Sequence, residues 1–299
     1  MRERARAPAK VNLQLRIHDP EPSGFHRLES LFCALELADE ITVEVDAAPA
    51  GGGGVKLDVE GPDLGPPEAN LAVRAARGFL ARAGVERAVA IRLRKTIPAG
   101  AGLGGGSSDA AAVLRALDAL LPGLVPPLEL AALARELGSD VPFFLRGDAL
   151  AWGSGRGDVL APAPPLPSAP VLLVFPPFPV STAAAYRWLD EDRASAPAAG
   201  AGAPPSVSAD WPPHSPRSWL AAAQRAANDF EAPVFRRHPE LRALRDLLAE
   251  AEAVIAMLSG SGSALFGVFS DEDVLRGAIA LLRARAPHVH LAPTRTASR

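Results

Sequence analysis

A glycine-rich stretch over residues 98–109, Pro-Ala-Gly-Ala-Gly-Leu-Gly-Gly-Gly-Ser-Ser-Asp, strongly limits what this chain can fold into. Glycine tolerates positive φ and lets the backbone approach a ligand closely. Residues 88–95 before it alternate as a strand does. Residues 110–121 after it form an apolar helical face, with Ser107 or Ser108 as the expected N-cap. The pattern therefore predicts a glycine loop that opens into a helix N-terminus, where free N–H groups favour a phosphate.

Three competing interpretations of this loop fit less well. A flexible surface loop is not usually held between a strand and a capped helix. The Walker motif requires Gly-Lys-Ser/Thr after its glycines, and no lysine comes after these. Gly100, Gly102 and Gly105 fit the dinucleotide pattern G-x-G-x-x-G, but a run so rich in glycine fits many patterns. The acid that a dinucleotide site needs after a second strand is missing, because Asp118 falls in mid-helix.

Composition narrows the class of protein further. The chain has 299 residues, enough for a large core and two domains. Its 31 basic and 34 acidic residues are mixed along the sequence, so nothing suggests a nucleic-acid or membrane partner. Cys33 is the one cysteine, which excludes an intramolecular disulfide and suits a reducing compartment. The sequence shows neither a long apolar run nor a signal peptide, and we expect a cytoplasmic protein.

Periodicity and helix breakers predict alternating strands and helices along the chain. Strands are expected at residues 11–17, 40–46, 55–59, 88–95, 171–175, 254–258, 264–269 and 289–291. Helices are expected at residues 70–83, 110–121, 128–137, 181–189 and 271–285, with Gly84 ending the first and Asp271 capping the last. The predicted division is an N-terminal domain (1–161), a Pro-rich linker (162–170), a C-terminal domain (171–293) with a mobile insertion (195–216), and a loose tail (294–299).

The loop, with its Ser-Ser pair, resembles the phosphate loop of the galactokinase, homoserine kinase, mevalonate kinase and phosphomevalonate kinase (GHMP) family. Six further stretches are similar to one branch of that family and occur in the same order: residues 7–13, 24–26, 137–143, 180–182, 228–233 and 258–263. That branch phosphorylates a methylerythritol that carries a cytidine diphosphate, in the non-mevalonate route to isoprenoids. The resemblance covers most of the chain.

The resemblance implies an α+β fold with two domains. The N-terminal domain is expected to be like domain 2 of ribosomal protein S5, and the C-terminal domain to be a ferredoxin-like α/β sandwich. The active site is expected in the cleft between them.

The resemblance also implies roles for individual residues. Lys10 and Asp140 match the catalytic pair at the phosphate acceptor, where a carboxylate can accept the proton of a hydroxyl and an ammonium can offset phosphoryl charge. The expected ATP-binding residues are Pro98, Ala99, Gly100, Ala101, Gly102, Leu103, Gly104, Gly105, Gly106, Ser107 and Ser108. Mg²⁺ is expected with ATP, and the sequence assigns it no ligand. Without the resemblance, Lys10 would be taken for a surface charge and Asp140 for a helix cap.

The substrate side is implied in the same way. Phe25 and His26 match the positions that hold the cytosine ring, and Tyr186 matches the aromatic on its other face. Asn12 is a further expected substrate-binding residue. The family often has Tyr where this chain has Phe25, a change that removes a hydroxyl and keeps the stacking face. The insertion at 195–216 makes the alignment of Tyr186 less direct.

The expected activity is therefore transfer of phosphate from ATP to the 2-hydroxyl of the cytidyl substrate. Another small-alcohol kinase of the family, such as a mevalonate or homoserine kinase, is the nearest alternative, although those substrates have no base to stack on Phe25. A nucleotide-dependent dehydrogenase and a ligand-binding sensor without activity are more distant possibilities. The sequence leaves the oligomeric state open.

Overall fold

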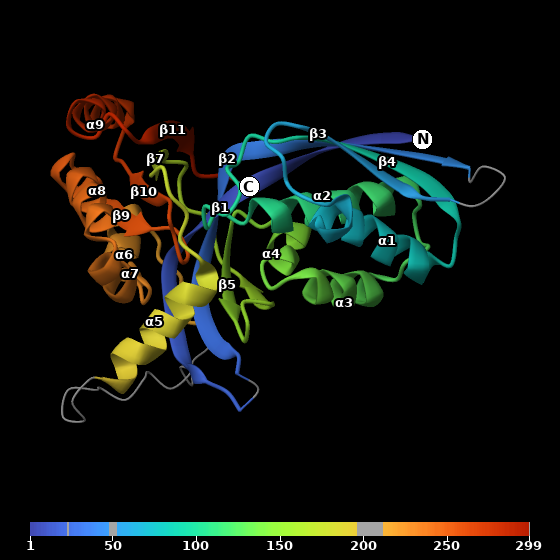
Figure 1. Cartoon of the computed structure of the whole chain (residues 1–299), viewed down its shortest axis with the longest axis horizontal. Helices are drawn as coiled ribbons and strands as arrows, with labels where there is room; N and C mark the ends of the chain where they lie inside the picture. The colour runs from blue at the N-terminus through green and yellow to red at the C-terminus, as the bar shows by residue number, and fades with distance from the viewer. Residues whose placement is uncertain (23, 48–52, 196–211, 299) are drawn as a thin grey trace. The chain divides into compact units, whose positions relative to one another are not determined.

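The computed structural model describes residues 1–22, 24–47, 53–195 and 212–298 (Figure 1). The chain forms two compact units whose segments alternate along the sequence. The first unit contains Met1–Ala9, Leu37–Ala99 and Gly104–Asp148, and the second contains Lys10–Glu36, Gly100–Leu103 and Ala149–Arg299. Two long strands, β1 (Arg2–Pro20) and β2 (His26–Ala47), contribute residues to both units.

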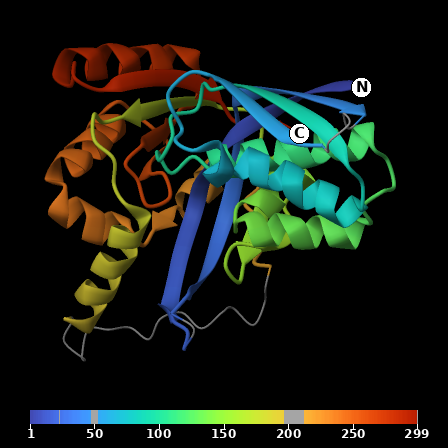
Figure 2. The same cartoon turned by 45° about the vertical axis from the view of Figure 1, so that its right-hand side comes forward.

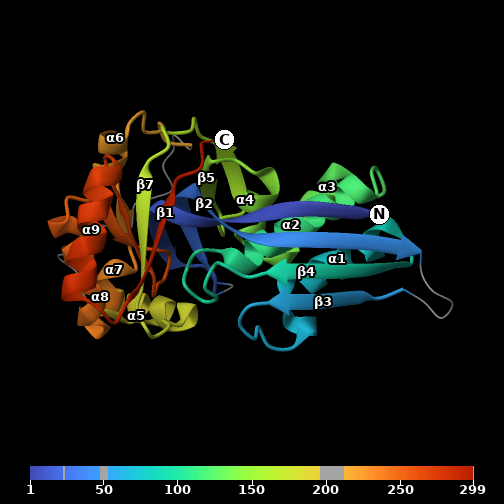
Figure 3. The ribbon, with the colours of Figure 1, turned by 90° about the horizontal axis from the view of Figure 1, so that it is seen from above.

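The first unit is a sheet covered on one face by helices. Strand β4 (Arg87–Arg94) pairs in parallel with β3 (Val55–Glu60) and antiparallel with the end of β2 (Figure 3). Helices α1 (Leu71–Ala83) and α2 (Gly105–Leu120) lie against this sheet, and α3 (Pro127–Leu137) and α4 (Val141–Arg146) lie beyond them (Figure 2). A 3₁₀ turn, η1 (Pro67–Ala69), precedes α1.

Helix α1 forms as the sequence predicts. The Asn70 side chain accepts a hydrogen bond of 2.9 Å from the Ala72 N–H and so caps the first turn. Gly84 ends the helix with a φ of 63°, a left-handed conformation that glycine adopts without strain. Val73, Ala76 and Phe79 lie on the buried face, which holds the helix against the rest of the unit.

The second unit contains a four-stranded antiparallel sheet in the order β11-β7-β10-β9. Its strands are β7 (Pro170–Phe175), β9 (Ile255–Leu258), β10 (Leu265–Val268) and β11 (His290–Arg295). Its helices are α5 (Thr182–Ala194), α6 (Trp219–Ala223), α7 (Glu231–Arg237), α8 (Pro239–Glu250) and α9 (Glu272–Arg285). One strand, helices, two strands, a helix and a final strand in this order give the predicted ferredoxin-like sandwich.

Three shorter strands of the second unit pair with β1 and β2 or extend that sheet. Strand β8 (Ala227–Asn228) runs parallel to β1, with Leu15 opposite Asn228. Strand β5 (Leu150–Ser154) is antiparallel to the start of β2, and β6 (Val159–Pro162) is antiparallel to β5. The α+β fold class predicted from the sequence is confirmed by this architecture.

Several local expectations need correction or lie outside the described residues. The tail predicted as loose from Thr294 is ordered as far as Ala297, because Thr296 is buried and bridges to Leu35, and the Ala297 N–H donates to the Ala34 carbonyl. Most of the predicted insertion, residues 196–211, lies outside the described residues. The linker predicted at 162–170 joins β6 to β7 and lies within the second unit.

Candidate active site

The glycine loop has the backbone that its sequence predicts. Gly100, Gly102 and Gly104 all have positive φ, of 70°, 79° and 71°. Helix α2 then begins at Gly105, earlier than expected, and its N-cap is Gly104. The prediction that Ser107 or Ser108 caps the helix is wrong, because the Ser108 N–H already donates to the Gly104 carbonyl at 2.9 Å. Both serines therefore lie in the first turn, beside the free N–H groups that can bind an anion.

Ser108 itself fits a ligand-binding role. Its side chain is fully buried, and its Oγ has no hydrogen-bond partner within the described part of the chain. A buried hydroxyl without a partner is costly, and one in the first turn of a helix is suited to contact a phosphate group. The residues present therefore fit a nucleotide phosphate at this helix start.

Gly102 lies against a second small-residue loop, residues 259–263. A Cβ on Gly102 would overlap the Ser259 carbonyl oxygen, an approach that no real side chain tolerates. The Ser259 Oγ donates a hydrogen bond of 3.1 Å to the Gly102 carbonyl. Only glycine therefore allows this approach, and the two loops hold each other in place.

Asn228 fixes the second loop. Its Nδ2 donates to the carbonyls of Leu258 at 2.9 Å and Gly260 at 2.7 Å, and its Oδ1 accepts from the Phe230 N–H. A hydrogen bond of 2.8 Å joins the hydroxyls of Thr182 and Ser261. The sequence marks these stretches as similar to the kinase family but assigns no site residue there, because the contacts join segments far apart in the chain.

Lys10 lies on β1 and is buried, with 5% of its surface exposed. Its Nζ donates to the Asn12 Oδ1 at 2.9 Å, and the Asn12 Nδ2 donates to the Ser30 Oγ at 2.7 Å. The Lys10 backbone N–H donates to the Leu103 carbonyl at 3.0 Å, next to Gly102. The second unit thus brings Lys10 and Asn12, two predicted site residues, close to residues 102 and 103. Lys10 is not the surface charge that its residue type alone would suggest.

Asp140 belongs to the first unit and immediately precedes α4. It occupies the N-cap position, but its side chain makes no capping hydrogen bond to that helix, and its φ of −84° is helical. The interpretation of Asp140 as a helix cap is therefore wrong, since a true N-cap side chain accepts from an N–H of the first turn. A Cβ on neighbouring Gly138 would lie 3.8 Å from the Ser107 Oγ, so this turn lies beside the start of α2.

A buried charge cluster, Asp39, Lys95 and Asp109, lies in the first unit. The Lys95 Nζ donates to Asp39 and, at 2.8 Å, to the Asp109 Oδ2. The Asp39 Oδ1 accepts from the N–H groups of Thr96 and Ile97, the residues that lead into the glycine loop. The Lys95 Nζ would lie 3.0 Å from a Cβ on residue 105, where α2 begins. The cluster therefore fixes the backbone at both ends of the glycine loop.

Burial dominates the electrostatics of this cluster. It raises the pKa of Asp109 from its ordinary 3.8 to about 7, because the lowering by the Lys95 ammonium is smaller than the cost of desolvation, and Asp39 adds a like charge. The Asp109 Oδ1 is buried without a hydrogen-bond partner among the described residues. Sequence reasoning misses the cluster, since no motif joins residues 39, 95 and 109.

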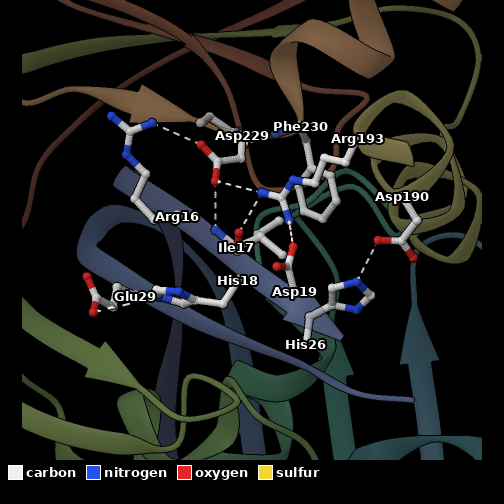
Figure 4. Close-up of polar contacts among 11 residues, drawn as sticks. Arg16, Ile17, His18, Asp19, His26, Glu29, Asp190, Arg193, Asp229 and Phe230 are labelled. Carbon is white, nitrogen blue, oxygen red and sulfur yellow. Dashed lines mark hydrogen bonds and ion pairs between the residues drawn. The ribbon is translucent and has the colours of Figure 1, made fainter. Parts of the chain in front are cut away.

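The predicted base-binding residues lie in the second unit. Phe25 is 52% exposed, and the Arg156 guanidinium lies 3.6 Å from its ring centroid. The His26 Nε2 is 2.8 Å from the Asp190 Oδ1 (Figure 4). The His26 and Tyr186 rings are 4.8 Å apart between centroids. The structure thus brings His26 and Tyr186 into direct contact and leaves much of Phe25 accessible.

A network of ion pairs surrounds the end of β1 in the same unit. Asp229 accepts from the Arg16 guanidinium at 3.0 Å and from the Ile17 N–H at 2.8 Å (Figure 4). Arg193 donates to the Ile17 carbonyl at 2.6 Å and lies near Asp229. These contacts anchor α5 and the residues after β8 to β1.

Neither a cluster of metal-ligating side chains nor a membrane-spanning helix is found among the described residues. Across these ranges, no group of three or more His, Cys, Asp and Glu side chains is placed to hold a metal ion. The same ranges include no helix that is long and apolar enough to cross a membrane.

The fold and this site define a class of protein. Residues 70–148 match the GHMP kinases N terminal domain, and residues 215–287 match the GHMP kinases C terminal domain. The chain belongs to the GHMP kinase family. A crystal structure of homoserine kinase from Cytophaga hutchinsonii, 16% identical, has a TM-score of 0.69 over 99% of this chain and 94% of that one, which shows a shared fold.

More similar proteins narrow the family to one branch. The 4-diphosphocytidyl-2-C-methyl-D-erythritol kinase of Anaeromyxobacter sp. (strain K) is 46% identical over 94% of this chain and 85% of its own. That of Chloroherpeton thalassium is 36% identical over 96% of both chains. A crystal structure of 4-(cytidine 5'-diphospho)-2C-methyl-D-erythritol kinase, 37% identical, has a TM-score of 0.76 and covers 98% of this chain and 99% of that one. The chain is a member of this branch, as the sequence predicts, and the dehydrogenase alternative is set aside.

Proposed function

We propose that this protein transfers the γ-phosphoryl group of ATP to the 2-hydroxyl of 4-diphosphocytidyl-2-C-methyl-D-erythritol, giving the 2-phosphate and ADP. The names of the similar proteins support the substrate. The observation that carries the reaction type is the start of α2, where left-handed glycines lead into a helix N-terminus. This helix start holds the buried Ser108 Oγ, which has no hydrogen-bond partner among the described residues. Such a site favours bound phosphates, whereas a flexible surface loop needs none of these features.

Residues 98–108 are proposed to bind ATP through backbone N–H groups and the Ser108 hydroxyl. ATP supplies the phosphoryl group, and Mg²⁺ bound with it offsets the negative charge of the phosphates. Magnesium keeps several of its waters and needs few protein ligands. The Asp39–Lys95–Asp109 cluster holds the backbone at the loop ends ready for the phosphates.

Lys10 and Asp140 are the proposed catalytic pair. Asp140 accepts the proton of the substrate hydroxyl as the new phosphate bond forms, which makes a poor nucleophile reactive. The Lys10 ammonium stabilises the ionised carboxylate and the charge on the transferring group. The hydrogen bond from Lys10 to Asn12, with Ser30 behind it, orients that ammonium, and the Lys10 backbone is bound to residue 103.

The cytidine group is proposed to bind near Phe25 and His26, with Tyr186 as the second aromatic. Arg156 lies on the Phe25 ring at 3.6 Å, and the ring remains half exposed. Stacking on aromatic side chains contributes about 1–3 kcal/mol per base. We therefore expect Phe25→Ala to raise the Michaelis constant for the cytidyl substrate roughly tenfold and to leave that for ATP nearly unchanged. Phe25→Tyr is the matched control and should be close to neutral.

The decisive experiment measures ADP release in a coupled assay, with and without the cytidyl substrate. Asp140→Asn should lower turnover by roughly 10²–10⁴-fold while ATP binding barely changes. Lys10→Ala should also be severely slowed, and its loss should not add to that of Asp140→Asn if the two act as a unit. Asp58→Asn and Lys56→Ala are the controls, because both residues are exposed on β3 and have no proposed role.

Two results would count against this function. If the rate of ADP release does not change with the cytidyl substrate but increases with mevalonate or homoserine, the protein is a different small-alcohol kinase. Near-normal turnover in Asp140→Asn would remove Asp140 from the mechanism.

A further inference from the structure

Helix α5 holds the His26 imidazole from two sides. Asp190 and Tyr186 are four residues apart and therefore project from the same face of the helix. Tyr186 lies against the imidazole, with 4.8 Å between ring centroids. The Asp190 Oδ1 is 2.8 Å from Nε2 (Figure 4). The His26 side chain is 7% exposed, so its ring has little freedom to turn.

This arrangement selects one tautomer of the imidazole. An ionised carboxylate can only accept hydrogen bonds. Nε2 must therefore be protonated, and its N–H donates to the Asp190 carboxylate. In the neutral ring, Nδ1 is then an acceptor. Within the described part of the chain, Nε2 is the ring nitrogen that makes a hydrogen bond. The second ring nitrogen, Nδ1, is thus left to recognise a donor group.

Cytosine and uracil differ in the exocyclic group to which such an acceptor would bind. Cytosine carries an exocyclic amino group, which donates hydrogen bonds, where uracil carries a carbonyl oxygen, which accepts them. An Nδ1 acceptor pairs with the amino group and faces a second acceptor in uracil. A site that satisfies one polar edge rejects an analogue that leaves its groups unpaired.

We propose that Asp190 is a positioning residue that sets the base specificity of this protein, by fixing the His26 imidazole with Nδ1 as an acceptor for the cytosine amino group. The proposal rests on the proposed function and deepens it. Asp190 does not touch the substrate. It acts through His26, and Tyr186 limits the rotation of the same ring.

The test compares the cytidyl substrate with its uridyl counterpart, the same methylerythritol diphosphate joined to uridine. Asp190→Ala should raise the Michaelis constant for the cytidyl substrate and reduce the preference for it over the uridyl one, each by roughly tenfold, the worth of one hydrogen bond to a charged group. The Michaelis constant for ATP and the turnover at saturation should stay within about twofold, since Asp190 contacts His26 and not the phosphates. Asp190→Asn keeps an oxygen acceptor and should retain part of the preference.

Asp192→Ala is the matched control, because it removes a carboxylate from the same helix that pairs with Arg236 and Arg237. If it lowers the preference as much as Asp190→Ala does, the effect comes from a weakened helix and the proposal is wrong. An unchanged preference in Asp190→Ala also overturns it.

A second measurement needs no substrate. The ¹⁵N chemical shifts of the His26 ring should report a protonated Nε2 and an unprotonated Nδ1 in the native protein at mildly alkaline pH, and a tautomer mixture in Asp190→Ala. Native protein with the opposite tautomer would refute the proposal even if the cytidyl substrate is used. If the protein shows the expected tautomer but does not phosphorylate that substrate, the proposed function fails instead.

Discussion

The two small-residue loops of this protein are similar in sequence but lead into different elements. Residues 98–108 and residues 259–263 both combine glycine with serine, and both have glycines at positive φ, such as Gly102 and Gly260. The first loop opens into α2, which begins at Gly105. The second joins the antiparallel strands β9 and β10, whose ends pair Leu258 with Leu265.

Because of that difference, the first loop is suited to bind a ligand, whereas the second loop supports the first. A helix start leaves several N–H groups without partners, so a phosphate can bind them. The second loop has its carbonyls at Leu258 and Gly260 bound by Asn228, and its Ser259 hydroxyl donates to Gly102. Glycine content alone therefore does not indicate a binding loop, and the next element in the chain is the better guide.

Gly102→Ala should break the contact between the loops and give the largest effect. The new Cβ would overlap the Ser259 carbonyl oxygen, at a φ that disfavours any side chain. We expect the free energy of unfolding to fall by about 3–5 kcal/mol, from the left-handed strain and the overpacking together. Gly100→Ala is the matched control: Gly100 has the same kind of φ, but no described atom lies within 4 Å of an added Cβ, so the change should cost about 1–2 kcal/mol. Equal losses measured by urea unfolding would mean that the loops do not constrain each other.

A carboxylate also lies behind each loop, the buried Asp109 at the first and the half-buried Glu231 at the second, and the pH dependence of stability should distinguish the two. Burial raises the pKa of Asp109 to about 7, and it raises the pKa of Glu231, whose Oε1 accepts from the Leu258 N–H. A carboxyl with a raised pKa in the folded state keeps its proton where the unfolded chain has lost it. Stability therefore falls as pH rises from about 4 to about 7, by at most about 1.4 kcal/mol per pH unit for Asp109.

The measurement is the free energy of unfolding of the native protein, Asp109→Asn and Glu231→Gln across that pH range. Asp109→Asn should flatten the curve up to about pH 7, and Glu231→Gln should flatten it less. Parallel curves for the native protein and Asp109→Asn would show that the pKa of Asp109 is not raised by folding.

Asn228→Ala should loosen the second loop and leave the start of α2 intact. It leaves the buried carbonyls of Leu258 and Gly260 without their donors. An unsatisfied buried group costs about 1–3 kcal/mol, and we expect a loss of stability of about 2 kcal/mol. The Michaelis constant for ATP should rise only slightly, because the variant affects the ATP loop only through the contact of the second loop with residues 100–103. Asn228→Asp, which keeps the shape but loses the donors, should be equally damaging.

Ser259→Ala is the mildest way to test the comparison. It removes one hydrogen bond, from the Ser259 Oγ to the Gly102 carbonyl, and keeps the backbone approach that Gly102 requires. We expect a loss of about 1 kcal/mol in unfolding free energy and little change in turnover. A loss as large as that of Gly102→Ala would show that the hydroxyl, and not the close backbone approach, holds the loops together.

The sequence is sufficient where the signal is local. Asn70 and Gly84 bound α1 as expected, and the Asp271 side chain caps α9 by accepting from two N–H groups. The strand, glycine loop and helix around residue 100 are also predictable. These features depend on neighbouring residues, so short patterns reveal them. The N-cap of α2 is misplaced by the sequence because Gly105 and Gly106 adopt helical backbone, against the low helix propensity of glycine.

Contacts between distant segments cannot be predicted in this way. The Asp39–Lys95–Asp109 cluster and the contact of Gly102 with Ser259 each join residues that no spacing rule connects. Similarity to a known family singles out residues 258–263 but gives no reason for them. The assignments of Lys10, Asp140 and the base-binding residues rest on that similarity and stay predictions, with the burial of Lys10 and the missing cap at Asp140 as support.

The pairing of β8 with β1 has a consequence for how this protein folds during its synthesis. Arg16 and Asp229, which bind each other, are separated by 213 residues. At synthesis rates of about 5–20 residues per second, roughly 10–40 s pass between the appearance of one and that of its partner. Leu15 and Ile17 pack in the same core as Phe230, Val234 and Phe235. During that interval the side chains of Leu15 and Ile17 lack these packing partners. Chaperone binding on the ribosome would therefore protect this part of β1 from aggregation until its partners are synthesised.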